Sequence, residues 1–190
     1  MERVPEHLFY KWESFFNLDD LHLIIATINK KHDREFKDIP AEREGVSIKK
    51  TKTKGILWLH IKDLLTQLER AIKITNRDNF GYHLYDLFDT DLLLFNTYNA
   101  KDESKYDWHK DAETDKAFDI KFTILINASI EPYEGGRLQF FTNGGELNVT
   151  EMDKPGSAIM FKADIPHRVL PVTSGIRRSI TIFINGPKFV

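Results

Sequence analysis

The sequence predicts a mainly β protein of the α+β class: a double-stranded β-helix (jelly roll) with N-terminal helices packed on one sheet. Helical periodicity is confined to the first 80 residues, and short alternating segments separated by glycine-rich turns fill residues 81–190. Helices followed by a run of strands are expected where helices support one face of a β-sandwich. With 190 residues we expect a single domain, 1–190, with helical support and leading strands in 1–80 and the jelly-roll core in 81–190.

Two amphipathic segments predict the helices. In the first, residues 17–31, Asn17 can cap the start, and Asp19 and Asp20 suit its positive end. The second, residues 59–75, has an apolar stripe that predicts a helix lying on a sheet. This stripe consists of Leu64, Leu65, Leu68, Ala71 and Ile72. The charged stretch between the helices, residues 42–55, predicts a strand or a mobile loop with a solvated basic face.

Six later segments have the length and alternation of strands. They are Tyr82–Leu87, Leu92–Tyr98, Phe118–Asn127, Arg137–Phe141, Ala158–Lys162 and Arg177–Ile184. The even positions of 118–126 are all apolar, which predicts a face turned toward the core. In the last segment one face carries Arg177, Ser179 and Thr181. A polar stripe inside a sheet requires solvent or a polar ligand, because an unpaired buried guanidinium is very costly.

Composition excludes several classes of function. The chain has no cysteine, so disulfides, thiolate metal sites and a cysteine nucleophile are ruled out, and any metal must be held by His, Asp or Glu. A formal net charge of -2 gives no basic field for nucleic acid or an anionic membrane, so neither is an expected partner. No apolar run approaches the roughly 18 residues that span a bilayer, and we expect a cytoplasmic protein. The oligomeric state is not predicted.

The segment around residue 109 carries a candidate metal site. His109 and Asp111 form a His-x-Asp pair, and on an extended backbone residues i and i+2 point to the same side. A second histidine, His167, follows 58 positions after the first. Two histidines and one carboxylate suit a non-haem iron(II) site with open positions. A surface ion pair for His109 and Asp111, and a structural role for His167, are the alternatives.

A candidate acid-binding group follows the second histidine. Arg177 lies ten residues beyond His167, and Ser179 shares its strand face. A guanidinium fork beside a hydroxyl suits one carboxylate of a dicarboxylic acid. Arg168 and Arg178 are alternative anchors, although strand parity and spacing favour Arg177.

Together these motifs resemble the catalytic domain of 2-oxoglutarate and iron(II)-dependent oxygenases, in particular the prolyl 4-hydroxylase-like branch. The resemblance covers residues from about 80 to 190, somewhat over half the chain. The matching motifs are, in order, Tyr98, His109 with Asp111, Gly135-Gly136-Arg137-Leu138, Pro166-His167, and Arg177 with Ser179. The resemblance implies Fe(II) ligation and catalysis by His109, Asp111 and His167, and 2-oxoglutarate binding by Arg177 assisted by Tyr98 and Ser179.

Two positions depart from the family pattern. Leu125 falls where some relatives place a tyrosine that helps to hold 2-oxoglutarate, so Tyr98 must do more of that work, or Thr123 and Lys121 contribute. Collagen-type members generally have lysine in place of Arg177, so this chain is more similar to the oxygen-sensing and bacterial relatives.

The resemblance implies a dioxygenase that hydroxylates an unactivated C–H bond with O2 and releases succinate and CO2, with ascorbate as a candidate reductant. A prolyl residue of a peptide or protein is the favoured substrate, and Tyr106 and Trp108, which flank the iron ligands, are candidates to contact it. The same mechanism on a free amino acid or another small molecule is the main alternative. A zinc hydrolase and a non-catalytic jelly-roll binding module are weaker ones, and an intact Asp111 argues against a halogenase.

Overall fold

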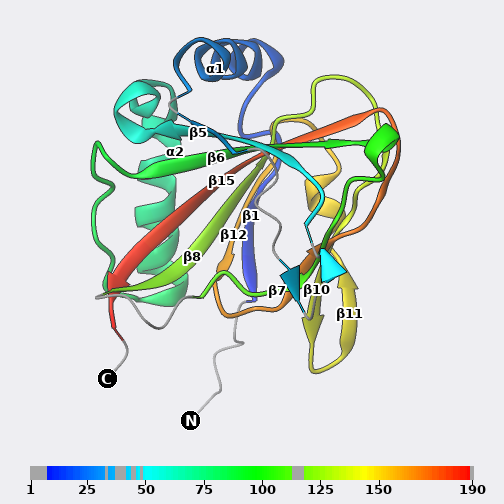
Figure 1. The fold of residues 1–190 in the computed structure, drawn as a ribbon. Helices are drawn as coiled ribbons and strands as arrows, with labels where there is room; N and C mark the ends of the chain where they lie inside the picture. The colour runs from blue at the N-terminus through cyan, green and yellow to red at the C-terminus, as the bar shows by residue number, and fades with distance from the viewer. Residues whose placement is uncertain are drawn as a thin grey trace.

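The computed structural model describes residues 8–32, 34–36, 42–43, 46–47, 49–112 and 118–188. Its fold has three layers: the helices, a large β-sheet in the middle, and a smaller sheet on the far side (Figure 1). This is the predicted mainly β jelly roll with N-terminal helices on one sheet, and the fold prediction is confirmed. The division into support and core regions stays a prediction.

The large sheet has seven strands, paired antiparallel throughout. In spatial order they are β1 (Phe9–Trp12), β12 (Ala158–Lys162), β8 (Phe118–Asn127), β15 (Ile176–Pro187), β6 (Leu92–Asn99), β5 (Lys52–Leu57) and β2 (Arg34–Phe36). The first third of the chain supplies both edges, while the C-terminal strand β15 lies in the centre. The helices cover one face of β15 and the smaller sheet lies over the other, so both of its faces are covered.

The smaller sheet has four strands and faces the large one. They are β11 (Gly145–Asn148), β10 (Leu138–Thr142), β13 (His167–Val169) and β7 (Tyr106–His109). Two further strand pairs join β14 (Val172–Ser174) to β9 (Glu134–Gly135), and β3 (Glu42–Arg43) to β4 (Val46–Ser47). Short helical turns connect these elements: η1 (Trp58–His60), η2 (Asn76–Phe80), η3 (Ala100–Asp102) and η4 (Thr150–Met152).

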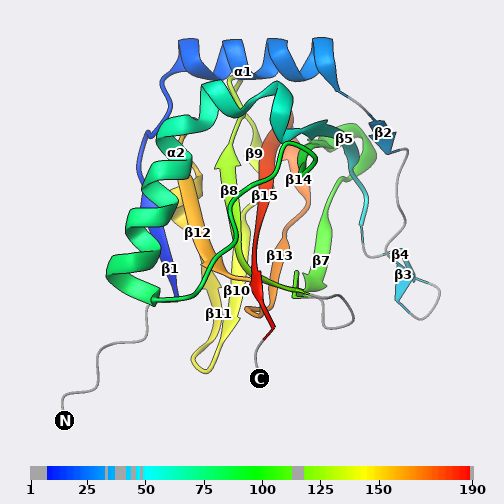
Figure 2. The ribbon, with the colours of Figure 1, turned by 90° about the vertical axis from the view of Figure 1, so that its left-hand side faces the viewer.

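Two α-helices cover the outer face of the large sheet (Figure 2). Helix α1 (Leu18–Lys31) begins with the predicted cap: the side chain of Asn17 accepts a hydrogen bond from the amide of Asp20, and the Asp20 carboxylate accepts one from the amide of Asn17. Helix α2 (Lys62–Thr75) starts three residues later than predicted, because residues 58–60 form the tighter turn η1. No helix among the described residues is long and apolar enough to cross a membrane.

The main core lies between the helices and the large sheet. The even positions of β8, represented by Phe122 and Ile124, pack there with Ile180 and Ile182 of β15 and with the buried faces of both helices. A second cluster, which includes Phe140 and Phe161, fills part of the space between the two sheets. The odd positions of β8 and β15 therefore face this second space, where the sequence places its polar stripe.

The strand predicted at Tyr82–Leu87 is wrong. This segment is an extended connection that packs Tyr82, Leu84 and Leu87 against the core without joining a ladder. The Asn76 side chain donates to the Tyr82 carbonyl at 2.8 Å and accepts from the Tyr82 amide at 3.0 Å. A side-chain amide thus takes both backbone groups of Tyr82, and the amide of Tyr85 makes a single bond to the Asn185 carbonyl of β15 at 2.8 Å without extending into a ladder.

The charged stretch at 42–55 lies partly outside the described residues, and its later part forms a strand. Thr51 and Thr53 are buried, whereas Lys50 and Lys52 are exposed. Lys49 forms a bridge with Tyr106 of β7, and β5 pairs with β6, so this one segment contacts both sheets. The strand alternative is confirmed for the part that forms β5.

Candidate active site

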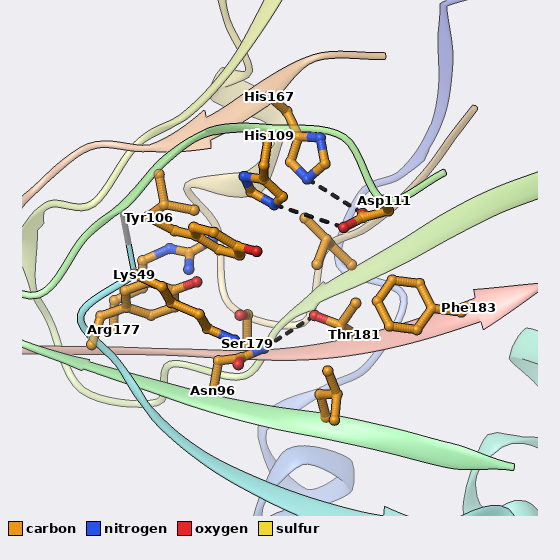
Figure 3. A pocket seen from close by; sticks show the side chains of 14 residues that line it. Lys49, Asn96, Tyr106, His109, Asp111, His167, Arg177, Ser179, Thr181 and Phe183 are labelled. Atoms are coloured by element: carbon orange, nitrogen blue, oxygen red, sulfur yellow. Dashed lines mark hydrogen bonds and ion pairs between the residues drawn. The ribbon is translucent and has the colours of Figure 1, made fainter. Parts of the chain in front are cut away.

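The smaller sheet brings the two predicted metal-binding histidines together. His167 of β13 is the direct cross-strand partner of His109 of β7. Asp111 follows β7, and its amide donates to the carbonyl of Ala163 at 3.0 Å, which fixes the backbone beside the histidines. One donor atom from each of His109, Asp111 and His167 lies within 4.8 Å of the others, a spacing that allows the three to hold one metal ion (Figure 3).

Backbone carbonyls set the orientation of both imidazoles. The Nδ1 of His109 lies 2.7 Å from the carbonyl oxygen of Asp107, and the Nδ1 of His167 lies 2.9 Å from that of Ile165. A carbonyl oxygen only accepts, so each Nδ1 must donate its hydrogen. Each Nε2 therefore faces the Asp111 carboxylate, at 3.7 Å for His109 and 3.3 Å for His167, and carries a proton only when its ring is charged. In the neutral ring this Nε2 has a lone pair, as a metal ligand requires.

The protonation states of His109 and Asp111 also favour binding of a cation. Burial lowers the pKa of His109 to about 4, and repulsion from His167 adds to that effect. Burial opposes ionisation of Asp111, but the hydrogen bond and attraction from His167, with smaller contributions from His109 and Thr123, outweigh it and lower the pKa of Asp111. At neutral pH His109 is therefore neutral and Asp111 is charged, as metal binding requires.

The large sheet supplies the opposite wall of the site. Arg177 of β15 pairs directly with Tyr98 of β6, and its guanidinium carbon lies 5.0 Å from the centre of the Tyr98 ring. Arg177 is only 2% exposed, and its Nη1 has no hydrogen-bond partner among the described residues. A buried guanidinium with an unsatisfied donor is costly unless an acid completes it. The site therefore fits an anionic ligand at Arg177.

A narrow cavity of about 80 Å³ joins the metal cluster to Arg177. Ser179 of β15 and Asn96 of β6, which are cross-strand partners, form part of its floor. Asn96 accepts a hydrogen bond from Thr53 at 2.9 Å and donates to Thr181 at 3.1 Å. The predicted polar face of the last strand thus forms the floor of the cavity, and it is extended by polar residues of β5 and β6.

The two candidate substrate residues lie in different places. Tyr106 lines the cavity and stacks on His109, with ring centres 3.5 Å apart and planes 12° apart. Trp108 does not line the cavity but contacts Arg168 and Phe141, with the Arg168 guanidinium carbon 4.5 Å above its ring. Arg168 in turn pairs with Glu146 at 2.9 Å, so it does not face the site.

The structure places two residues whose roles the sequence left open, and two cavity residues that the sequence did not indicate. Thr123 does not line the cavity, but it donates to the Oδ2 of Asp111 at 2.6 Å, and Lys121 pairs with Asp119 at 3.2 Å. Lys49 and Asn96 line the cavity although the sequence did not single them out. Lys49 has the same parity as the buried threonines 51 and 53, a signal that the neighbouring lysines obscured.

Taken together, the fold and the site define a jelly-roll protein in which two histidines and one carboxylate that could hold a metal ion share a cavity with a buried arginine. Residues 93–185 match the model of the 2OG-Fe(II) oxygenase superfamily. Over these residues the chain is similar to this superfamily, and it has the fold of prolyl hydroxylases.

Solved structures with this fold include several prolyl hydroxylases. A prolyl-4-hydroxylase from Pseudomonas putida is 19% identical, with a TM-score of 0.70 and coverage of 96% of this chain and 94% of that one. A viral collagen prolyl hydroxylase from Paramecium Bursaria Chlorella virus-1 is 14% identical, with a TM-score of 0.68 and coverage of 95% and 97%. A Trichoplax adhaerens prolyl hydroxylase is 14% identical, with a TM-score of 0.66 and coverage of 93% and 83%. No curated protein sequence matches the chain.

Proposed function

We propose that this chain is an Fe(II)- and 2-oxoglutarate-dependent dioxygenase that hydroxylates a prolyl residue of a peptide or protein and releases succinate and CO2. The observation that carries the proposal is the convergence of His109, Asp111 and His167 at one end of a cavity and Arg177 at the other. When bound, iron and 2-oxoglutarate supply the activation of O2 and the oxidation of the C–H bond.

The iron would be held by His109, Asp111 and His167. Each histidine presents its Nε2, because its Nδ1 is committed to a backbone carbonyl. Asp111 supplies negative charge, and the hydroxyl of Thr123 limits rotation of its carboxylate. Three protein ligands leave coordination positions open for 2-oxoglutarate and O2, as the oxygenase chemistry needs.

In this proposal Arg177 binds the distal carboxylate of 2-oxoglutarate. Its Nη1 is already stripped of water and held without a protein partner, so binding a carboxylate satisfies it without further desolvation of the guanidinium. Tyr98 lies beneath the guanidinium and holds its plane, and Ser179 offers a hydroxyl on the same strand face. Ascorbate is proposed as the reductant that maintains the iron.

A prolyl substrate is favoured by the fold shared with prolyl hydroxylases, one of which was solved in complex with a peptide fragment of hypoxia inducible factor. The cavity is too small for a peptide in addition to the acid. The peptide would therefore contact the site at its rim. Tyr106, stacked on His109, is proposed to contact it there, and Trp108, outside the cavity, is proposed as a more distant contact.

The decisive experiment is anaerobic titration of the iron(II) form with 2-oxoglutarate. We expect a weak visible charge-transfer band in the wild-type chain and its loss in His167→Ala. Absence of the band in the wild type would reject the proposed cofactors. Iron, 2-oxoglutarate, ascorbate, O2 and a library of proline-containing peptides should then give succinate together with a +16 mass shift on proline.

Other outcomes separate the alternatives. Succinate release with free amino acids but with none of the peptides would favour the small-molecule oxygenase. A chain that binds 2-oxoglutarate but releases no succinate with any candidate would favour the binding module. Hydrolytic activity with zinc that survives Arg177→Ala would favour a zinc hydrolase.

A further inference from the structure

Lys49 places a second cation in the cavity. The cavity walls carry Lys49 and Arg177 against one carboxylate, that of Asp111. The ammonium of Lys49 points inward toward Ser179 and Asn96, and lies 5.1 Å from the centre of the Tyr106 ring (Figure 3). Two cations against one carboxylate leave one net positive charge, and a divalent metal would add two more, so the loaded cavity favours a ligand with more than one negative charge.

Backbone pairing with the chain at β7 holds Lys49 in this position. Lys49 forms a β-bridge with Tyr106, and the amide of Lys50 donates to the carbonyl of Lys105 at 2.9 Å. Alternation along the strand then turns Lys49 inward and Lys50 outward to solvent. The inward direction is thus imposed by pairing with β7.

Lys49 also interacts with the metal end of the cavity. Burial lowers the pKa of Lys49, and attraction to Asp111 opposes that effect. Its charge is one of the groups that lower the pKa of His109, after burial and His167. Arg177, by contrast, stands against Tyr98 of β6. The two cations therefore approach the cavity from different strands and different directions.

We propose that Lys49 is a second cationic anchor for 2-oxoglutarate, acting together with Arg177. This inference rests on the proposed function. A cavity of about 80 Å³ has room for one small acid, so a cation directed into it meets that acid rather than a separate substrate. Charge-assisted hydrogen bonds from two ammonium or guanidinium groups suit a dicarboxylic acid, which carries two negative charges.

Isothermal titration calorimetry of 2-oxoglutarate into the anaerobic iron(II) form of the full chain tests this proposal. Lys49→Met keeps the length of the stem and removes the charge, and we expect it to raise the Kd by about tenfold or more. Lys49→Arg should recover most of the affinity. Lys50→Met is the matched control, one residue away on the exposed face, and should stay within about twofold of the wild type.

Iron affinity, measured in parallel, separates binding from folding. Loss of a positive charge near Asp111 should leave iron binding unchanged or slightly tighter in Lys49→Met. A 2-oxoglutarate Kd within about twofold of the wild type in Lys49→Met would overturn the inference, and so would an equal loss of iron and 2-oxoglutarate affinity. A wild-type chain that binds no 2-oxoglutarate would reject the proposed function itself, an outcome visible without any variant.

Discussion

Thr123 shows how one hydroxyl can organise a metal site. Its Oγ1 donates to the Oδ2 of Asp111 at 2.6 Å, and the same carboxylate oxygen lies 3.3 Å from the Nε2 of His167. The carboxylate is thereby fixed before any cation arrives. Partners of this kind orient metal ligands and typically affect metal affinity strongly.

We expect Thr123→Val to weaken iron(II) binding by about 10- to 100-fold, because valine keeps the shape of threonine but cannot donate to Asp111. Thr123→Ser should retain most of the affinity. Competition with a metal-binding dye measures both variants, with Thr66→Val on the exposed face of α2 as the control. Equal affinities for the valine and serine variants would contradict the role of the hydroxyl.

His109 makes the stability of the metal-free chain depend on pH. Its pKa is about 4 in the folded state, below the ordinary 6.5, so the unfolded chain binds the proton first. The contribution of His109 to the free energy of unfolding is therefore fully present above pH 6.5, and it is lost as the pH falls toward 4. This contribution is at most about 3 kcal/mol, because each unit of pKa difference between the folded and unfolded states corresponds to about 1.36 kcal/mol.

Urea unfolding of the metal-free chain between pH 7 and pH 4 measures this dependence. We expect His109→Gln to remove part of the slope, while His22→Gln, an exposed substitution on α1, leaves it intact. Parallel curves for the wild type and His109→Gln would contradict the pKa assigned to this residue.

The sequence predicts the residues that share a local pattern, but not those that meet only through register. His109 with Asp111 and Arg177 with Ser179 are related by i, i+2 alternation, so each pair could be placed on one face in advance. Asn96 reaches the cavity because it lies opposite Ser179, and the register that pairs β6 with β15 cannot be read from either strand alone.

At the level of elements, the turn between β9 and β10 determines where Arg177 can lie. Gly136 has a φ of +62°, and a Cβ at this position would lie 2.8 Å from the Cδ of Arg177 and 2.9 Å from Val172. The backbone passes so close to the arginine stem that only glycine fits. The Gly-Gly motif is therefore a packing requirement of the acid-binding group.

Gly136→Ala should accordingly reduce 2-oxoglutarate affinity by about tenfold or more, because the added methyl displaces Arg177. Gly145→Ala is a matched control: its φ is +95°, but a Cβ there meets nothing within 4 Å. We expect Gly145→Ala to lower the Tm while leaving the Kd for 2-oxoglutarate unchanged. Calorimetric titration and thermal melts of both variants test the difference, and equal Kd values would contradict it.

The elements missed by the sequence are those with the weakest local signal. β7 and β13 span four and three residues and carry the polar ligands themselves, so neither shows an apolar alternation. They become strands because they pair with each other and with β10. The opposite error, at residues 82–87, arose where an alternating segment makes a single backbone bond to β15, from Tyr85 to Asn185, and no ladder.

At the level of the whole molecule, one core joins the helices to the large sheet. Phe122 is fully buried in it, with its ring centre 4.9 Å from that of Phe80 and 5.2 Å from that of Tyr82. The layer order was predictable because helical and alternating patterns occupy different parts of the chain. The contribution of β1 and β2 to opposite edges was not, because strand order depends on pairing between distant segments.

We expect Phe122→Ala to lower the free energy of unfolding by about 3–5 kcal/mol, because it leaves a cavity in the core shared by helices and sheet. Phe141→Ala, at a side chain that is 53% exposed, should change it by less than about 1 kcal/mol. Urea unfolding measures both, and similar losses for the two variants would contradict a single shared core.

The segment from Lys49 to Leu57 connects the two sheets on one side of the sandwich. Lys49 forms a bridge with β7, and β5 pairs with β6. Separating the two sheets on this side breaks the bond from the Lys50 amide to the Lys105 carbonyl. The amide of Lys50 is therefore protected from exchange for as long as the two sheets stay joined on this side. Deuterium uptake at the Lys50 amide would report any separation of the two sheets on this side.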